Sequence, residues 1–355
     1  MNEQIEVKNT TLSDFYDKNK YSGLAYLIKL CLMPFVFFAI LGFPTFGGVG
    51  NYVSALSNFA SLSFFILCGF FTLTPDRNKR IRKITRALKR SAIFAGVLFV
   101  VYIALNIVYL AYIGGLEKLA SPEFLRMRTF FNFFVLNMWP LPIGVGFWFI
   151  QSLLYAYLFF FVAEKLKLYK SYVPVLIVLY IFMVLTGELA AISRFSLFCG
   201  FLTRAIPFMI IGMLLRKYVD KLYRIPRVWY LITFAIGIIM AVGELHLLMR
   251  FNLLTNTDNM IGSTVMALSV CGFAVSDPVA VKNFLSSHGR SYAMRMYALC
   301  EPISLLIWIM CREMFPVAYS AIKEFNSFIC LAVCFFIAFF IGFVKYKIVH
   351  RKEME

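Results

Sequence analysis

The sequence predicts an all-α fold, a polytopic integral membrane helix bundle of about ten transmembrane helices with both termini in the cytoplasm. Apolar stretches of roughly twenty residues recur along the chain, and a bilayer core takes about 20 helical residues to cross. Because lipid offers no hydrogen bonds to the backbone, such stretches must be helical. The composition agrees, since 61% of residues are hydrophobic and only 15% are charged, against about 25% charged in soluble domains.

The segments follow one another from the N-terminus in a single membrane domain. Residues 1–20 are polar and lack the apolar core of a cleavable signal, so the first apolar helix is expected to act as an uncleaved insertion signal. Residues 21–346 form the transmembrane domain, and 347–355 form a charged tail. The predicted membrane helices are 22–43, 51–73, 92–113, 143–163, 172–190, 196–215, 228–245, 259–276, 291–312 and 327–346.

One further apolar stretch, residues 129–140, is too short to span a bilayer and predicts an interfacial or re-entrant piece.

The basic residues predict the orientation of the bundle. With both ends inside, most of the 35 Lys and Arg residues lie in cytoplasmic loops and tails, as membrane topology favours. The net charge of +17 is therefore assigned to topology and to contact with anionic membrane lipids. No nucleic acid partner is expected, although a soluble chain of this charge would suggest one.

The densest basic cluster is the loop predicted at 76–91, DRNKRIRKITRALKRS. If it is helical, Lys and Arg at steps of three form a basic stripe on it. One interpretation is a topology anchor on anionic lipid. The other is a cradle for a phosphate-rich cytoplasmic donor such as a nucleotide-bearing thioester, because Arg and Lys bind phosphate well. The candidate donor-binding residues are Arg77, Arg80, Lys83, Arg86 and Arg90, together with Lys29 in the first helix.

Ionisable residues inside membrane helices are costly, so each is a candidate for function. Lys29 and Arg204 lie within apolar segments, and so do Arg295 and Glu301. The last two are six residues apart and should face different sides of their helix. As a group, these residues predict a polar cavity inside the bundle. The expected cavity residues are Trp148, Gln151, Arg204 and Arg295.

Histidine and cysteine offer few catalytic candidates. His246 follows Glu244 near the predicted outer face, whereas His288 lies in a predicted cytoplasmic loop and His350 in the charged tail. Most of the eight cysteines fall inside apolar segments, and no spacing suits zinc, so neither a metal nor a structural disulfide is expected. No hydrolase elbow, P-loop or dinucleotide fingerprint is present.

Four stretches, in order, resemble the acyltransferase-3 family, the membrane O-acyltransferases of bacterial surface polysaccharides. The closest match is the helix that begins GFWFIQSLLYAYL, and the basic stretch 77–90 falls where the family has an Arg-rich loop. The four stretches are SFFILCGFFT (63–72), GFWFIQSLLYAYLFFF (146–161), RAIPFMIIGMLL (204–215) and LSSHGRSYAMRMYALCEPI (285–303).

The resemblance implies a ten-helix bundle that moves an acyl group from a cytoplasmic thioester, an acyl-CoA co-substrate, to a sugar hydroxyl at the outer face. No cofactor is expected to stay bound. The family's first helix carries a catalytic Arg and a His eleven residues later. In the best alignment Lys29 takes the Arg position and Ile40 the His position, and other registers put Met33 or Cys31 there. No register supplies a histidine, because the first one in the chain is His246. Cys68 and Cys300 replace a usual Ser and the late-motif His. The family's histidine is therefore missing.

Two functional hypotheses remain open for a multi-pass protein of the cell membrane, expected to be a bacterial cytoplasmic membrane. The first is an acyltransferase with a changed centre, in which the base is Glu244, His246 or Glu301, or Cys300 acts as a nucleophile. The second is a non-catalytic protein of the same fold that moves or binds a lipid-linked sugar, or is a subunit of an envelope-polysaccharide assembly. The expected partners are a glycan or lipid-linked sugar, and a homo-oligomer is an open possibility.

Overall fold

The described part of the chain consists of helices and their connections. The computed structural model describes residue 16 and the ranges 23–44, 49–115, 127–186, 200–250, 260–276, 284–314 and 319–351, and no strand occurs among them. In chain order the first helices are α2 (Gly23–Cys31), α3 (Met33–Leu41), α4 (Val49–Leu56), α5 (Phe59–Thr72), α6 (Arg77–Tyr112), α7 (Met127–Phe134), α8 (Phe147–Lys165), η4 (Leu168–Ser171) and α9 (Tyr172–Thr186). The π-helical turn η5 (Phe201–Ala205) follows, and then α11 (Ile206–Lys217), α12 (Val219–Tyr223), α13 (Arg227–Arg250), α14 (Ile261–Ser276), α15 (Phe284–Met314), α16 (Tyr319–Glu324) and α17 (Asn326–Arg351).

The protein is an all-α polytopic membrane bundle, as the sequence predicted. Every predicted membrane segment coincides with a helix or with two consecutive helices. Among the described residues, 8 helical stretches are long and apolar enough to cross a bilayer. The remaining two segments, 201–217 and Ile261–Ser276, are shorter in the described part of the chain.

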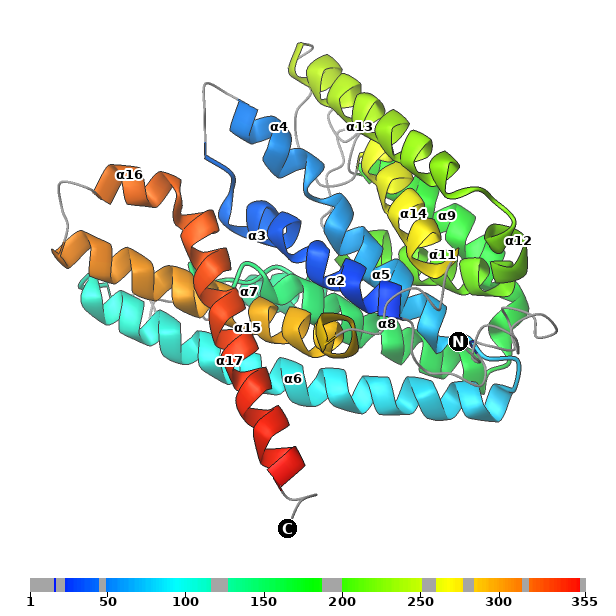
Figure 1. Ribbon diagram of the computed structural model, residues 1–355, viewed down its shortest axis with the longest axis horizontal. Coiled ribbons are helices and arrows are strands. Elements are labelled where there is room, and N and C mark those ends of the chain that lie inside the picture. Colours follow the sequence, from blue (N-terminus) through cyan, green and yellow to red (C-terminus); the bar gives the residue numbers. More distant parts are fainter. Residues whose placement is uncertain are drawn as a thin grey trace.

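The predicted loop at 76–91 is wrong, because α6 is one continuous helix of 36 residues from Arg77 to Tyr112. Its length is about 54 Å, and its N-terminal half carries the basic residues beyond the apolar run. Figure 1 shows it as a single long helix. The Asp76 side chain caps this end by accepting hydrogen bonds from the amides of Asn78 and Lys79, and these bonds lower the pKa of Asp76.

Small residues set the closest helix contacts. α5 packs on α11, and a Cβ atom added at Gly69 would lie 2.0 Å from the carbonyl oxygen of Met209. One added at Gly212 would lie 1.9 Å from that of Ile66. Only glycine permits such an approach, which is how membrane helices gain packing contacts without a hydrophobic driving force.

The other main contacts are α13 with α14, α15 with α17, α6 with α8, and α15 with α2. In Figure 1, α13 lies along the upper right of the bundle and α6 along its lower edge, with α2, α5 and α8 between them. The faces of α9 and α13 are the least buried of the candidate spans, so these helices face lipid.

Candidate functional site

A cavity of about 410 Å³ lies among the central helices. Its walls come from α2, α3, α5, α6, α8, η5 and α15, and from the non-helical α7–α8 segment (residues 135–146). Non-helical backbone at membrane depth is tolerated where it is buried in protein or lines a cavity. The predicted interfacial or re-entrant piece therefore supplies part of a cavity wall, while α7 itself has eight residues and cannot span a bilayer.

One end of the cavity carries Lys29 and the basic half of α6. Lys29 is 6% exposed, and its Nζ lies 5.2 Å from the ring centroid of Phe71. Cys68 lines the cavity one helical turn before Phe71. Arg90 is exposed and lines the cavity beside buried Ser91, so the cavity meets the last residue of the basic stretch of α6. This end can attract phosphate or another anion.

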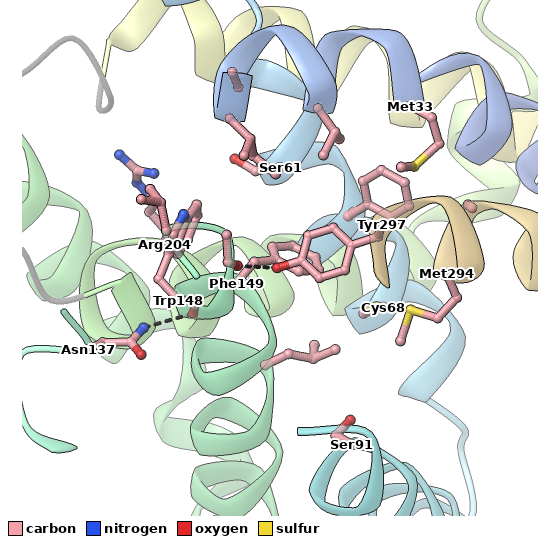
Figure 2. A pocket seen from close by; sticks show the side chains of 18 of the residues that line it. Met33, Ser61, Cys68, Ser91, Asn137, Trp148, Phe149, Arg204, Met294 and Tyr297 are labelled. Atoms are coloured by element: carbon pink, nitrogen blue, oxygen red, sulfur yellow. Dashed lines mark hydrogen bonds between the residues drawn. The ribbon is translucent and has the colours of Figure 1, made fainter. Parts of the chain in front are cut away.

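The opposite end carries Arg204, Trp148 and Asn137, which Figure 2 shows together on one side of the cavity, away from Cys68 and Met33. Arg204 is 1% exposed, and its guanidinium carbon lies 4.9 Å from the centroid of the Trp148 ring. It sits on the π-helical turn η5, a local geometry that often occurs at functional sites.

Gly200 lies just before η5 and packs closely against the residues at this end of the cavity. A Cβ atom at this position would lie 2.7 Å from Ser152 Oγ and 3.1 Å from Asn137 Nδ2. The glycine therefore lets the turn that carries Arg204 approach Asn137 and Trp148 closely.

The charged groups that line the cavity, among the described residues, are all cations: Lys29, Arg90 and Arg204. The described lining contains no Asp, Glu or His. The remaining polar lining groups are amides, hydroxyls, indoles and a thiol. The arrangement suits an elongated ligand with anionic and hydroxyl groups and an apolar part, whereas a strong general base is missing from these walls.

The sequence-predicted catalytic residues lie outside this lining. Glu244 is half-buried on α13, where its carboxylate accepts a hydrogen bond from the Gly262 amide at the start of α14. His246 is exposed on the same helix. Cys300 is buried between α15 and α17, and its carbonyl accepts a hydrogen bond from Cys330 Sγ at 3.1 Å. These three residues serve helix contacts or face outward.

Glu301 lies directly behind the cavity wall. It is 7% exposed, and its Oε1 accepts a hydrogen bond from the amide of Gly146, which lines the cavity and precedes α8. Tyr297, one turn earlier on α15, donates to the Gly146 carbonyl. Glu301 and Tyr297 therefore hold the end of the α7–α8 segment in place. Arg295 faces the other way, toward the carbonyl of Ala338 on α17 at 3.4 Å, so the two charges do point to different helix faces.

Of the four residues predicted to line the cavity, two do so and two do not. Trp148 and Arg204 line the cavity, whereas Gln151 and Arg295 do not. Gln151 is buried and donates from Nε2 to the carbonyl of Phe133, which attaches α7 to α8.

The predicted basic stripe on α6 spirals around the helix, because each step of three residues turns by about 300°. Arg80 is buried and forms a bidentate ion pair with Glu164, with Nε–Oε1 at 2.7 Å and Nη2–Oε2 at 2.9 Å. Arg77 donates to the Glu164 carbonyl at 2.7 Å. Both therefore join α6 to the end of α8. Lys83 is half-buried, and only Arg86 and Arg90 of the predicted donor-binding set are exposed.

Two of the predicted histidines have side chains outside the described part of the structure. They are His288 on α15 and His350 on α17. The described cysteines are all free thiols. No group of three metal-binding side chains occurs among the described residues.

Comparison with protein-family models, with curated proteins and with solved structures found no match to this chain. The resemblance to the acyltransferase-3 family therefore stays a prediction from the sequence motifs.

Proposed function

We propose that this protein is a membrane-embedded O-acyltransferase of the acyltransferase-3 kind, in a bacterial cytoplasmic membrane. It would transfer a short acyl group from a cytoplasmic acyl-CoA to a hydroxyl of a cell-surface glycan. One observation carries the proposal: a single cavity is lined by Lys29 and by Arg90 of the basic stretch of α6, and also by Arg204 and Asn137.

The chemistry follows from what each end can bind. Lys29 and Arg90 would attract the phosphates of the donor, and the apolar walls would hold its extended arm. The carbonyl carbon would leave the thioester sulfur and bond to the hydroxyl oxygen of the glycan. The hydroxyl proton balances the departing thiolate, so that the products are an ester and a free thiol. Arg204 would stabilise negative charge that develops at the outer end.

The test is transfer of label from radioactive acetyl-CoA to the glycan fraction of membranes that contain the protein. We expect Lys29→Met and Arg204→Gln to reduce transfer about 10- to 100-fold, as the loss of one charge-assisted hydrogen bond does. Glu244→Gln and His246→Ala are matched controls in the same bundle and should transfer normally, because neither residue lines the cavity. If acetyl-, propionyl- and butyryl-CoA all give no transfer, the proposal is wrong.

A second candidate is favoured by the lack of Asp, Glu and His among the described lining residues, since an alcohol must lose a proton during acyl transfer. In this case the protein binds or moves a lipid-linked sugar without chemistry, alone or within an envelope-polysaccharide assembly. The lipid extract of the purified protein would then contain a polyprenyl-linked sugar by mass spectrometry. Lys29→Met and Arg204→Gln would remove this lipid, and no label would be transferred.

A further inference from the structure

Asn137 has an unusual backbone and position. It lies in the α7–α8 segment with φ of 61°, in the left-handed region, which asparagine tolerates better than most residues. The residue is 0% exposed, yet it lines the cavity. Buried residues held in sparsely populated backbone regions are concentrated at functional sites, so Asn137 is a candidate for ligand contact.

The hydrogen bonds of Asn137 fix which way its amide points. Nδ2 donates to the Trp148 carbonyl at 2.9 Å (Figure 2). It also contacts Ser152 Oγ. A backbone carbonyl can only accept, so the nitrogen and not the oxygen must face Trp148. Oδ1 is consequently turned away from this carbonyl. It is buried and has no hydrogen-bond partner among the described residues.

A second polar atom of the α7–α8 segment is also buried without a hydrogen-bond partner among the described residues. Trp139 lines the cavity two residues later, and its Nε1 is buried without a described partner. An indole N–H can only donate, whereas Oδ1 of Asn137 can only accept. Nearly all buried polar groups in native proteins are paired, so the segment lacks partners of both kinds. A hydroxyl group can both donate and accept and would suit such a wall.

We propose that Asn137 recognises a hydroxyl group of the ligand, with Oδ1 accepting a hydrogen bond from an aliphatic O–H that enters this end of the cavity. The inference rests on the proposed function, in which a hydroxyl is the acceptor, and it names the residue that selects it. An amide is not a base at neutral pH, so Asn137 binds and positions the hydroxyl and takes no proton from it.

The experiment measures the preference for a hydroxyl directly, on the full chain in lipid nanodiscs. The probes are 1-octanol and methyl octyl ether, because the ether keeps an apolar chain and an acceptor oxygen but has no O–H. Of the 4 Trp residues, Trp139 and Trp148 line the cavity. In a Trp229→Phe, Trp308→Phe background, tryptophan fluorescence therefore reports on the cavity. Partition of each probe into empty nanodiscs gives the baseline.

We expect the protein to bind octanol about three- to tenfold more tightly than the ether after this correction, the range of one neutral hydrogen bond. Asn137→Gly should abolish the preference, and glycine suits the positive φ at this position. Asn106→Ala is the matched control. Asn106 is also a buried amide and holds the same segment through Ile143, but its donor and acceptor are paired and it is not in the described lining. It should keep the preference even if it lowers stability.

Three results would overturn the inference. The first is a wild-type protein that does not prefer octanol, which needs no variant to be folded. The second is an equal preference in wild type and Asn137→Gly. The third is an ordered water on Oδ1 that stays in place when octanol is bound, because the water alone then pairs this oxygen. Failure here leaves the transfer assay unaffected, so loss of the Asn137 role and loss of acyl transfer are separate outcomes.

Discussion

At the scale of single residues, the strongest polar link described in the structure is the ion pair of Arg80 and Glu164. The Thr74 carbonyl accepts a further hydrogen bond from Arg80, at 2.8 Å, and Tyr172 donates to Glu164 at 3.0 Å. Four segments of the chain therefore meet at one buried pair. The hydrogen bonds of both charged groups are made within the protein, and neither residue lines the cavity. Removal of the pair should therefore affect stability and not ligand binding.

We predict that Glu164→Ala lowers the free energy of unfolding by about 3–5 kcal/mol, because it leaves the buried Arg80 guanidinium unpaired. The double variant Arg80→Met, Glu164→Leu should recover most of the loss, since no buried charge remains. The measurement is thermal unfolding in detergent. Arg82→Ala, an exposed neighbour on α6, is the control and should change stability by less than about 0.5 kcal/mol. An equal effect of Arg82→Ala and Glu164→Ala would contradict the prediction.

Some residues of the candidate site could be predicted from the sequence, and others could not. Lys29 and Arg204 were found because a charge inside an apolar helix is costly and must turn inward. Asn137 was missed because a neutral amide in a short irregular segment gives no such signal. The neighbouring Pro140, Pro142 and Gly144 do indicate a break from helix there, but not which side chain faces the cavity.

At the scale of helices, the tightest packing is that of α5 on α11 through Gly69 and Gly212. We predict that Gly69→Val prevents the close approach, because the new side chain meets the Met209 backbone. The variant should lose its single symmetrical peak in size-exclusion chromatography. Gly96→Ala is the matched control, since a Cβ atom there meets nothing within 4 Å, and alanine raises helix propensity. A Gly69→Val protein as stable as wild type would refute this contact.

The sequence located the membrane helices well and their ends less well. Apolar runs mark only the part of a helix that lies in lipid, so α6 was predicted to begin at 92 although it begins at Arg77. Its charged half contains Arg, Lys, Leu and Ala, all good helix formers, and Asp76 caps it. The side chains that meet across helices could not be predicted, because they depend on tertiary packing. This is why Glu301 was expected at a catalytic centre but holds the Gly146 backbone.

At the scale of the whole molecule, the orientation of the bundle decides which side of the membrane each end of the cavity faces. The basic end of α6, with Lys29 and Arg90, must face the cytoplasm for an acyl-CoA to enter there. The same orientation follows from the distribution of Lys and Arg along the chain. The proposed transfer and the topology are therefore linked, and the topology can be measured alone.

We predict that both termini and the basic half of α6 are cytoplasmic. In a background without native cysteines, Lys79→Cys should react with a membrane-impermeant maleimide only after the cells are permeabilised. Ile113→Cys, just after the other end of α6, should react in intact cells. Both positions are exposed, so access to the reagent is limited by the membrane and not by burial. Reaction at position 79 in intact cells would show that the bundle has the opposite orientation. Lys29 and Arg90 would then face outward, where no acyl-CoA is present, and the proposed direction of transfer would be wrong.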